Sequence, residues 1–584
     1  MRHSCAHMLA QAVLEMFPDA KLGIGPTTDD GFYYDFDLPR TLIPEDLDIL
    51  QEKMEAIAKE KQTFNRVESK PKKAAEFYKK AGQPYKVELI EDLEKDGETM
   101  VTFYENLSPD GEVKFSDLCR GGHTDDTSKA GAFKLTKIAG AYWRGDEKRP
   151  MLQRIYGVCM NDKKALRVHL QMLEEAKKRD HRKLGKELEL FTFSELVGPG
   201  LPLWTPKGTL IRNLLDDFVW QLRKERGYEK VAIPHITKKD LYETSGHWQK
   251  FSDELFRITT REGHEFAMKP MNCPHHTQIY RHIPRSYKDL PQRYAETTMV
   301  YRDEQTGELH GLARVRSITQ DDAHVFCRKA QVKEEFLKIW DIIEIFYKAV
   351  GFEDLQIRLS LHDPDEFEKY LGTPQLWGGA EESLREIARE KGAEFTEAIG
   401  EEAFYGPKVD FVTRDSIGRE WQVATIQLDI NMPERFDLFC VNEEGEQERI
   451  VMIHAAIMGA IERFMAIFIE HHAGAFPLWL CPVQVIVLPV SDKFLDYAQE
   501  VADGLNGADV RVEVDDSNEG LGKKIRAAEM RKIPYMLVVG EKEVAAKQVA
   551  VRNYRTKKQN VMPAESFIDG VIKEIKERKL EAEL

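Results

Sequence analysis

The periods of hydrophobic and polar residues predict a mixture of helices and strands in residues 1–160. Near the N-terminus, polar side chains recur every four residues, at His3, His7, Gln11 and Glu15. This spacing matches one face of a helix and predicts an amphipathic helix at the start of the chain. Two runs rich in aromatic residues, GFYYDF at 31–36 and VTFYENL at 101–107, are expected to be strands.

One long charged helix is predicted next, over residues 163–185, where it would lead into a new domain. Between residues 186 and 477, runs rich in β-branched and aromatic residues dominate. They are VAIPHI at 231–236, RYAETTMVY at 293–301, KVDFVTR at 408–414 and EWQVATIQLDI at 420–430. Their hairpin-like spacing predicts an antiparallel sheet.

After Pro477 and Pro482 the pattern changes to an alternation of strands and helices. Strands are expected in VQVIVLPV, ADVRVEV, PYMLVVG and QVAVRNY, with helices near 493–506 and 521–532 and a final helix at the C-terminus. Alternation of this kind predicts an α/β domain with a largely parallel sheet.

The length of the chain requires several hydrophobic cores. With 584 residues, 42% of them hydrophobic, three to four domains are expected. The changes of pattern place domains at 1–160, 186–477 and 478–584, with a linker helix over 161–185. The chain is therefore predicted to be an α+β multidomain protein.

The sequence also indicates where the protein works. Seven cysteines, an odd number without paired spacing, indicate reduced thiols in the cytoplasm. No apolar run approaches the roughly 18 residues that a membrane helix needs, so no membrane contact is expected. The N-terminal helix pattern is unlike that of a signal peptide.

Net charge argues against a general nucleic-acid binder. The formal charge of −16 is opposite to that of a surface that tracks phosphates. Locally, residues 523–558 hold eleven Lys or Arg against three Glu, and KKRDHRKLGK at 177–186 is also basic. An acidic body with basic patches suits a selective binder whose affinity weakens with salt. Ordinary solvated helix faces are the alternative interpretation of each basic run.

The most informative stretch is YRDEQTGELHGLARVRSITQDDAHVF at 301–326, in which two apolar and basic runs flank a polar loop. It predicts a hairpin with Arg302 and Arg314 on paired strands. A guanidinium grips a phosphate with a planar fork and keeps its proton, while Glu304 could accept from an amino group. An anion and an amino group together suggest a nucleotide. A solvated, charged hairpin is the alternative.

This stretch resembles motif 2 of the class II aminoacyl-tRNA synthetases, and its ending, TQDDAHVF, is similar to the threonyl-tRNA synthetases. Other segments resemble the same family in the same order: KPMNCP at 269–274, AFYGPK at 403–408, WQVATIQLD at 421–429 and MIHAAIMGAIERF at 452–464. The resemblance runs from residue 3 to the C-terminus. It implies a class II antiparallel catalytic sheet with flanking helices, an N-terminal α+β editing domain and a C-terminal α/β anticodon-binding domain. A small ubiquitin-like domain that the family commonly has before this point is expected to be absent.

The resemblance implies one Zn²⁺ per subunit, held by Cys273, His324 and His454. A thiolate and two imidazoles suit zinc, and three protein ligands leave coordination positions open. An open metal would take the amino and hydroxyl groups of L-threonine and reject valine, which has no hydroxyl. Serine lacks only a methyl group, worth about 1 to 3 kcal/mol, so a second, editing step is expected. The residues implied to bind threonine are Asp322, Tyr405 and Gln422.

For activation, the resemblance implies that the threonine carboxylate attacks the α-phosphate of ATP, with Arg302 on that phosphate and Arg463 on the γ-phosphate. Fixed cations would stabilise the charge of the transition state, and Mg²⁺ would bridge the phosphates. The catalytic residues implied are Arg302, Arg463 and Gln320. The ATP contacts implied are Arg302, Glu304, Arg314, Gln320, Gln422, Gln427 and Arg463.

Four residues with paired spacing stand out: His3 and His7, and Cys119 and His123 in DLCRGGH. The histidine pair would share one helix face, and the second pair is expected on a loop. These four groups could form a closed zinc site or could orient water for ester hydrolysis. The resemblance implies hydrolysis of serine from mischarged tRNA without a metal, with Asp117 also in the site. Gly122 stands where the family usually has proline, which predicts a more permissive backbone before His123.

In the C-terminal domain the resemblance implies that Glu543 and Arg552 read anticodon bases, since carboxylates accept from base amino groups and guanidiniums pair or stack. An exposed ion pair is the alternative at each position. A homodimer is expected through motif 1 around Pro234. The implied partners are tRNA(Thr), ATP, L-threonine and a second copy of the chain. Two other functions stay open: a tRNA-sensing protein without catalysis, and a metal-dependent hydrolase that uses the N-terminal cluster.

Overall fold

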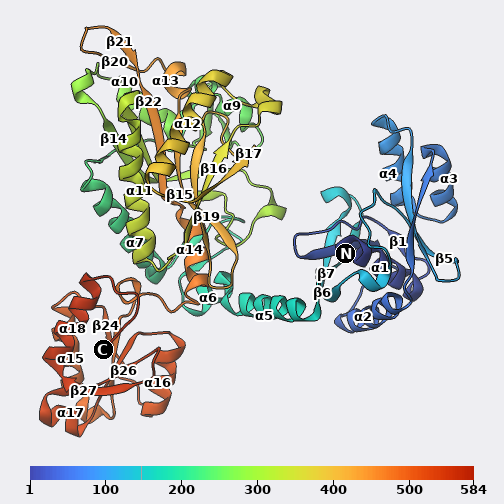
Figure 1. Cartoon of the computed structure of the whole chain (residues 1–584). Coiled ribbons are helices and arrows are strands. Elements are labelled where there is room, and N and C mark those ends of the chain that lie inside the picture. The colour runs from blue at the N-terminus through green and yellow to red at the C-terminus, as the bar shows by residue number, and fades with distance from the viewer. Residues whose placement is uncertain (147) are drawn as a thin grey trace. The chain divides into compact units, whose positions relative to one another are not determined.

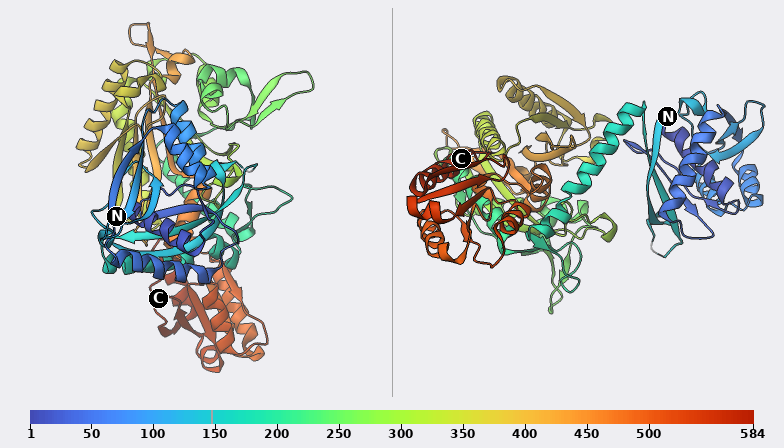
Figure 2. Two further views of the ribbon diagram at one scale, coloured as in Figure 1. Left: turned by 90° about the vertical axis from the view of Figure 1, so that its right-hand side faces the viewer. Right: turned by 90° about the horizontal axis from the view of Figure 1, so that it is seen from below.

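The computed structural model describes residues 1–146 and 148–584 and divides the chain into two compact units. Unit 1 spans Met1–Glu174 and unit 2 spans Glu175–Leu584. Figure 1 labels the elements of each unit, and Figure 2 shows them from two further sides. Among the described residues, no helix has both the length and the apolar character to cross a membrane.

Unit 1 contains two antiparallel sheets, in the orders β1-β2-β7-β6 and β3-β4-β5. The strands are β1 (Lys21–Leu22), β2 (Gly31–Asp37), β3 (Thr63–Ser69), β4 (Val101–Leu107), β5 (Val113–Leu118), β6 (Ala132–Tyr142) and β7 (Met151–Met160). The helices are α1 (Arg2–Met16), α2 (Pro44–Lys59), α3 (Pro71–Lys80) and α4 (Pro84–Lys95). The strands expected in GFYYDF and VTFYENL are confirmed as β2 and β4.

Helix α1 is confirmed, and it lies inside unit 1. Its neighbours are α2 and β2, and its apolar residues, among them Leu9 and Val13, belong to the core of the unit. His7 and Gln11, which belong to the expected polar stripe, are also buried. The middle of this stripe therefore faces other protein groups, and only its two ends, at His3 and Glu15, reach solvent.

The charged segment at 163–185 forms two helices and not the single one expected. Helix α5 runs from Lys163 to Arg179, and α6 runs from His181 to Glu187. Between them Asp180 leaves the helical conformation, with ψ of 121°, and its carboxylate accepts from Arg182 N at 2.8 Å. A side-chain cap of this kind begins a new helix, which explains why the expectation of one helix is wrong.

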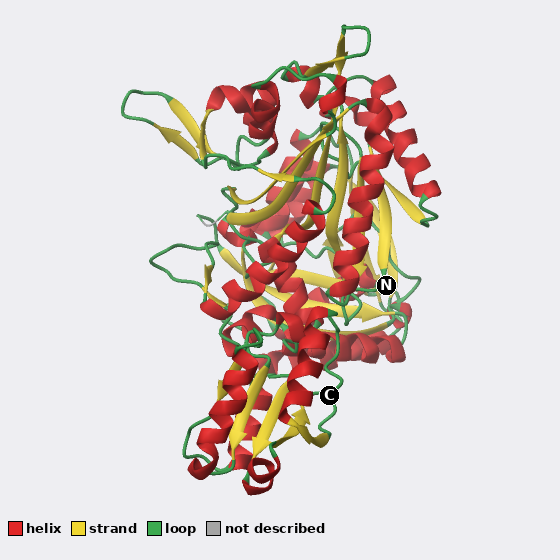
Figure 3. Ribbon diagram, turned by 90° about the vertical axis from the view of Figure 1, so that its left-hand side faces the viewer, coloured by secondary structure: helices red, strands yellow, loops and turns green. Residues whose placement is uncertain are grey.

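Unit 2 is built on an eight-stranded sheet in the order β10-β14-β15-β22-β19-β18-β16-β17. The strands are β10 (Glu229–Lys230), β14 (Gln292–Tyr301), β15 (Ser317–Cys327), β16 (Leu355–Leu361), β17 (Phe395–Ile399), β18 (Lys408–Arg414), β19 (Glu420–Asp429) and β22 (Val451–Ala460). The β10–β14 and β16–β17 pairs are parallel and the other pairs are antiparallel, as expected for the body of the sheet. The helices that bury its core are α7 (Pro206–Lys224), α11 (Val332–Ala349), α12 (Pro374–Glu390) and α14 (Ile461–His471). Figure 3 shows the long strands of this sheet beside the helices that cover it.

Short elements surround the large sheet. The strands are β8 (Phe191–Thr192), β9 (Leu203–Trp204), β11 (Ile236–Lys238), β12 (Arg257–Thr259), β13 (Glu265–Met268), β20 (Phe439–Val441) and β21 (Gln447–Arg449). The helices are α8 (Lys239–Ser245), α9 (His247–Lys250), α10 (Cys273–Arg281) and α13 (Met432–Arg435).

The run VAIPHI is not the strand that was expected. Strand β10 ends before this run, and β11 begins at its last residue, Ile236. Pro234 has no N–H to donate to a neighbouring strand, so a regular ladder cannot continue through it. The runs RYAETTMVY, KVDFVTR and EWQVATIQLDI are confirmed as β14, β18 and β19.

The C-terminal part of unit 2 has a five-stranded sheet in the order β24-β23-β25-β26-β27. The strands are β23 (Val485–Pro489), β24 (Val512–Val514), β25 (Tyr535–Val539), β26 (Gln548–Asn553) and β27 (Gln559–Pro563). The helices are α15 (Leu495–Asn506), α16 (Leu521–Met530), α17 (Glu541–Ala546) and α18 (Ala564–Lys576). The alternation is confirmed, but the largely parallel sheet is wrong, because β26 and β27 are antiparallel to their neighbours. Only the short α17 separates β25 from β26, and a parallel return needs a crossover of about a dozen residues or more.

Helix α11 offers a matched pair of side chains for testing the core of unit 2. Phe336 is fully buried, whereas Ile345 on the same helix is 42% exposed. Phe336→Ala should lower the free energy of unfolding by about 3 to 5 kcal/mol, because it leaves a cavity. Ile345→Ala should change it by less than about 1 kcal/mol. Urea titrations followed by circular dichroism measure both, and equal effects would contradict this assignment of the core.

Candidate functional sites

Three neighbouring strands of the large sheet place polar side chains in one row. In the β15–β22 pair His324 lies opposite His454, and in the β22–β19 pair His454 lies opposite Gln427. Side chains of directly opposed residues project from the same face of a sheet. These three side chains therefore share one face. Asp322, two residues before His324 on β15, projects from that face as well.

Cys273, at the start of α10, completes a cluster with the two histidines. Its sulfur and one ring nitrogen from each of His324 and His454 lie within 4.8 Å of one another, and all three residues are buried. His324 Nε2 is 3.1 Å from His454 Nδ1. Two nitrogens bound to one tetrahedral zinc ion would be about 3.3 Å apart. The donor atoms and their spacing therefore fit a single zinc ion.

Hydrogen bonds orient both imidazoles. His454 Nε2 donates to Asp429 Oδ2 at 2.9 Å, and Asp429 Oδ1 accepts from two backbone N–H groups. On the other ring, His324 Nδ1 lies 2.8 Å from His276 Nδ1. The remaining nitrogens, Nδ1 of His454 and Nε2 of His324, point into the cluster. Partners of this kind fix the tautomer and the direction of metal-binding histidines.

Burial keeps His324 and Cys273 uncharged. Desolvation lowers the pKa of His324 well below its usual value, and neighbouring imidazoles lower it further. Desolvation also raises the pKa of the Cys273 thiol, with Asp322 and Asp429 acting in the same direction. Neutral imidazoles can donate lone pairs to a metal, and a bound cation would stabilise the thiolate with release of a proton.

Asp322 and Tyr405 border the cluster. Asp322 Oδ1 is 3.7 Å from His324 Nε2, and its Oδ2 accepts from Asn272 Nδ2 at 3.0 Å. The ring centroid of Tyr405 is 5.2 Å from that of His454. A carboxylate at this position can accept from an amino group, and the tyrosine ring can pack against a small side chain.

The three predicted glutamines differ in how they are bonded. Gln320 Oε1 is buried without a hydrogen-bond partner. Gln422 donates to Asp410 Oδ1 at 2.6 Å, and Gln427 donates to Gly406 O at 3.0 Å. Gln320 therefore presents a free acceptor, while the other two are held by residues at or just before β18.

Arg302 and Arg314 lie in a loop and not on paired strands as expected. Strand β14 ends one residue before Arg302, and β15 begins three residues after Arg314. Arg302 N donates to Arg316 O at 3.0 Å. The residues between lack the alternation that a strand needs, so the regular ladder stops. We call residues 302–316 the arginine loop.

Three guanidinium groups meet at this loop. Desolvation, followed by the positive charges of Arg302 and Arg314, lowers the pKa of Arg463 on α14, and Glu304 opposes this shift. Arg314 Nε donates to Glu304 Oε2 at 2.8 Å, so its charge is compensated. Arg302 Nε is buried without a hydrogen-bond partner. The positive charge of Arg302 and Arg463 favours an anionic ligand.

His247, at the start of α9, is a candidate that no sequence pattern indicates. Its Nδ1 is 2.8 Å from Ser245 Oγ, and its Nε2 is buried without a partner. Desolvation, followed by the charges of His454 and Arg302, lowers its pKa to about 3. It is therefore a neutral imidazole with a free nitrogen near both the metal-type cluster and the arginine loop. A lone histidine has no period or spacing that could reveal it.

A second cluster lies in unit 1. His3 and His7 come from α1, Cys119 and His123 come from the loop after β5, and their ligand atoms lie within 4.8 Å of one another. Cys119 Sγ is 3.3 Å from His3 Nε2 and 3.3 Å from His123 Nε2. His3 Nδ1 donates to Gly121 O at 2.8 Å, which ties the start of α1 to the loop.

Burial also makes this cluster neutral. Desolvation lowers the pKa of His7 to about 3 and that of His123 to about 2, and neighbouring imidazoles add to both shifts. Desolvation raises the pKa of Cys119 to about 12. Both ring nitrogens of His7 are buried without a hydrogen-bond partner. Such imidazoles can bind a metal or orient and accept from water.

Asp117, at the end of β5, has two buried partners. Lys86 Nζ is 2.6 Å from Asp117 Oδ1, and Tyr34 OH donates to Asp117 Oδ2 at 2.5 Å. No sequence pattern indicates Lys86 as part of this site. In the loop, Gly122 has φ of 90°, whereas proline is restricted to about −65°. The backbone before His123 therefore requires a residue that tolerates positive φ.

Glu543 and Arg552 are each bonded within the C-terminal sheet domain. Glu543 accepts from Gly540 N at 3.0 Å and so caps α17. Arg552, on β26, donates from Nη2 to Glu529 Oε1 at 3.1 Å, and its Nε is buried without a partner. The two residues bind different partners, and Arg552 keeps one free donor.

Comparison with protein families matches three parts of the chain. Residues 101–156 match the Threonyl and Alanyl tRNA synthetase second additional domain. Residues 256–472 match the tRNA synthetase class II core domain (G, H, P, S and T), and residues 484–574 match the Anticodon binding domain.

Similarity to single proteins covers nearly the whole chain. The threonine–tRNA ligase of Porphyromonas gingivalis is 50% identical over 577 residues, which are 98% of this chain and 87% of the relative. The threonine–tRNA ligase of Cytophaga hutchinsonii is 49% identical over 576 residues, which are 98% of this chain and 88% of the relative. Among solved structures, the RNA binding domain of threonyl-tRNA synthetase from Cryptosporidium parvum has a TM-score of 0.64 and 37% identity, covering 69% of this chain and 99% of that one. The prolyl-tRNA synthetase of Giardia lamblia shares the fold. Its TM-score is 0.56 at 18% identity, and the match covers 70% of this chain and 81% of that one.

His7 should make unit 1 sensitive to acid. Its pKa of about 3 in the folded chain lies below the ordinary 6.5, so its stabilising effect is complete above pH 6.5 and is lost as the pH falls toward 3. From pH 7 to pH 5 this group alone should lower the free energy of unfolding by about 2 kcal/mol. In His7→Gln, which does not titrate, the loss should be smaller by this amount. Hydrogen exchange of residues 2–16 at both pH values measures it, and an equal loss in the variant would contradict a buried, neutral His7.

Proposed function

This chain belongs to the threonyl-tRNA synthetase family, and from that membership we propose that it joins L-threonine to tRNA(Thr) in two steps. Threonine reacts with ATP to give threonyl-adenylate and pyrophosphate, and the threonyl group then passes to the tRNA. Seryl-tRNA(Thr) made in error is hydrolysed by the N-terminal domain. The observation that carries the activation step is the convergence of Cys273, His324 and His454 on one face of the sheet.

We propose that these three residues hold one Zn²⁺ per subunit. Support comes from the 3.1 Å between the two facing ring nitrogens and from the hydrogen bond that Asp429 accepts from His454. The bound ion would offer open coordination positions to the amino nitrogen and the hydroxyl of threonine. Asp322 is proposed to accept from the amino group.

Recognition of the hydroxyl explains the choice among amino acids. Valine fits the same space but has no hydroxyl, and leaving a polar site unmatched costs far more than misplacing a methyl group. Serine keeps the hydroxyl, so activation separates it from threonine by only about 10-fold to 200-fold. We propose that Tyr405 and Gln422 line the threonine pocket. The weak discrimination against serine requires the second, hydrolytic step.

Activation is proposed to depend on positioning and charge. The threonine carboxylate attacks the α-phosphorus, the bond to the pyrophosphate oxygen breaks, and negative charge builds up on the phosphates. Arg302 would contact the α-phosphate and Arg463 the γ-phosphate, with Gln320 as the third catalytic group. The unpartnered polar atoms of Arg302 and Gln320 support this assignment. ATP enters as its Mg²⁺ complex, and the further ATP contacts proposed are Glu304, Arg314, Gln422 and Gln427.

We propose that the cluster of unit 1 is the editing site. Water attacks the ester carbonyl of seryl-tRNA(Thr), serine is released, and the tRNA hydroxyl is regenerated. A ring with the low pKa of His7 is a weak base, so several rings together are proposed to orient the water. Its two free ring nitrogens support this role. The residues proposed for editing are His3, His7, Asp117, Cys119 and His123.

A closed zinc site is the second candidate for this cluster. Its four donor atoms lie within 4.8 Å of one another, which also fits one ion. In that case water would have no open position at the metal. The zinc content of the chain distinguishes the editing site from the closed zinc site. One ion per chain supports the editing assignment, and two ions per chain support the closed zinc site.

The remaining proposals concern tRNA binding and assembly. We propose that Glu543 and Arg552 read the anticodon of tRNA(Thr), and the free Nε of Arg552 supports this. A homodimer formed around Pro234 and a cytoplasmic location are proposed from the family resemblance. The proposed domains are 1–160 for editing, 161–185 for the linker, 186–477 for catalysis and 478–584 for anticodon binding.

Loss of the metal should abolish activation. In Cys273→Ser, zinc measured by mass spectrometry should fall from one ion per chain to near zero. Threonine-dependent ATP–pyrophosphate exchange should fall by more than about 100-fold, because the ion that recognises the hydroxyl is gone. Cys481→Ser, at another buried cysteine, is the control and should keep both the zinc content and the exchange activity. Strong exchange by chelated, metal-free protein would overturn the zinc assignment.

Hydrolysis of seryl-tRNA(Thr) tests unit 1. His7→Ala should slow deacylation by about 100-fold or more, since it removes a group that orients water. Threonine-dependent exchange should not change, because activation belongs to unit 2. Glu15→Ala, on the same face of α1 two turns later, should change neither rate. Full deacylation by His7→Ala would exclude this cluster as the editing site.

A further inference from the structure

Helix α6 is bonded to the arginine loop through one histidine. His181, the first residue of α6, has a side chain that is only 2% exposed. Its Nδ1 donates to Glu470 Oε1 at 2.7 Å, and its Nε2 accepts from Leu312 N at 3.1 Å. A backbone N–H can only donate, so Nε2 is unprotonated and Nδ1 carries the proton. One nitrogen therefore bonds to α14 and the other to the arginine loop.

The arginine loop approaches this ring very closely. Gly311 has φ of 51°, and a Cβ at this position would lie 2.3 Å from His181 Nε2. The next residue, Leu312, is fully buried in the main core of unit 2. Loss of its partner on His181 would leave a buried N–H unpaired, which is costly. The middle of the loop is therefore fixed on α6.

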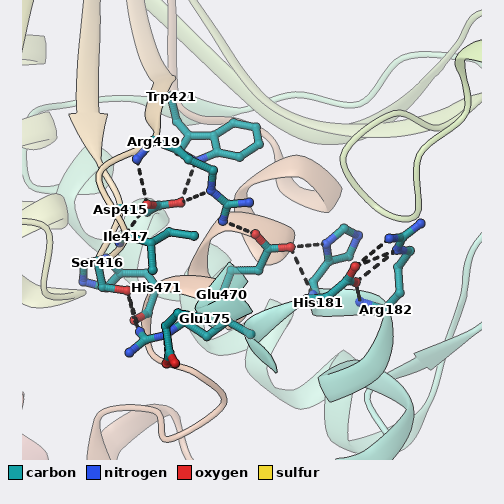
Figure 4. A network of polar contacts seen from close by, with 12 residues as sticks. Glu175, His181, Arg182, Asp415, Ser416, Ile417, Arg419, Trp421, Glu470 and His471 are labelled. Atoms are coloured by element: carbon teal, nitrogen blue, oxygen red, sulfur yellow. Dashed lines mark hydrogen bonds and ion pairs between the residues drawn. The ribbon is translucent and has the colours of Figure 1, made fainter. Parts of the chain in front are cut away.

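Glu470, the other partner of His181, is itself fixed. It lies near the end of α14, the helix that also carries Arg463. Its Oε1 accepts from both N and Nδ1 of His181, while its Oε2 pairs with Arg419. Arg419 Nε donates in turn to Asp415 at 2.7 Å, as Figure 4 shows. His181 thus rests on a polar network that lies outside the arginine loop.

Hydrogen bonding, and not a metal, accounts for this cluster. Asp180, His181 and Glu470 each offer a ligand atom within 4.8 Å of the others. However, Asp180 accepts from Arg182, and both ring nitrogens of His181 are bonded to protein groups. A metal ligand must direct a free lone pair at the ion. The cluster is therefore a junction between α6, α14 and the loop.

We propose that His181 is a positioning residue for the ATP site, an inference that rests on the proposed function. By bonding to both the arginine loop and α14, it fixes Arg302 relative to Arg463. One ATP molecule needs these two guanidinium groups at a set separation, and a misplacement of about 1 Å can cost a factor of about 100 in rate. His181 acts through the loop and not by contact with the substrate.

This role changes the interpretation of the basic segment at 177–186. Arg179, near its start, donates to His471 O at 3.1 Å and to Ser416 Oγ at 2.5 Å. Together with His181 it bonds the segment to the catalytic part of the chain. For these two side chains, the alternative of an ordinary solvated helix face is wrong, because both are engaged by protein groups.

Two substitutions separate the two hydrogen bonds of the ring. In His181→Gln the amide reaches the place of Nε2 and can still accept from Leu312 N, whereas in His181→Asn it reaches only Nδ1 and can donate to Glu470. His181→Asn should raise the dissociation constant and the KM for ATP by about 10-fold to 100-fold, the effect of an unpaired buried donor. The KM for threonine and the zinc content should not change. His181→Gln should stay within about fivefold of the unmodified chain.

His362 provides a matched control. Its N and Nδ1 bond to Glu381 Oε1 as those of His181 bond to Glu470. Among the described residues, no hydrogen bond joins its ring to the arginine loop. His362→Asn and His362→Gln should therefore have equal dissociation constants for ATP. Gly311→Ala, which crowds the ring from the loop side, should repeat the effect of His181→Asn.

Calorimetry of ATP binding without threonine decides the inference. Equal dissociation constants for His181→Asn and His181→Gln would overturn the positioning role. If the His181 variants do not fold, Gly311→Ala replaces them, and an unchanged dissociation constant in that variant would overturn it as well. A chain that binds ATP but does not activate threonine would overturn the proposed function and still allow this test.

Discussion

The face of the large sheet that carries His324 and His454 depends on the register between strands β15 and β22. This register sets His324 opposite His454, and a slip by one residue would turn every side chain of one strand to the other face. Asp321 secures the register from the opposite side of β15. Its carboxylate accepts from the N–H groups of Ile457 and Met458 at 2.9 and 3.1 Å, where the regular pairing is interrupted. One buried carboxylate thus helps to determine which ring nitrogens of His324 and His454 face one another.

Both clusters use burial to keep titratable groups neutral, but their surroundings differ. In unit 2, Asp429 and His276 each engage one nitrogen of a ring and leave the other directed at the cluster. In unit 1, neither nitrogen of His7 has a partner. Rings with a fixed orientation suit a permanently bound ion, because the rings are already oriented before the ion binds. Rings with free nitrogens suit water and a substrate that enters and leaves.

Much of the local structure can be predicted from the sequence, because short-range patterns determine helices, strands and turns. The period of α1 and the runs that form β14, β18 and β19 are sufficient to identify these elements. The spacing of His3 and His7 also predicts that they share a helix face, and the structure agrees. The errors occur where one residue overrides the pattern: Pro234 interrupts a strand, and Asp180 divides a helix. Neither effect extends beyond a few neighbouring residues.

The sequence alone determined most of the elements and, through its motifs, the family. Only the tertiary structure decided which distant residues meet, since this depends on strand order and register. No spacing links Cys273 to His324 and His454, and family resemblance was needed to nominate them. The lone residues His181 and His247 show the same limit, because their importance arises from burial and from partners far along the chain. Desolvation and hydrogen-bond geometry are properties of the folded chain, and a one-dimensional pattern does not contain them.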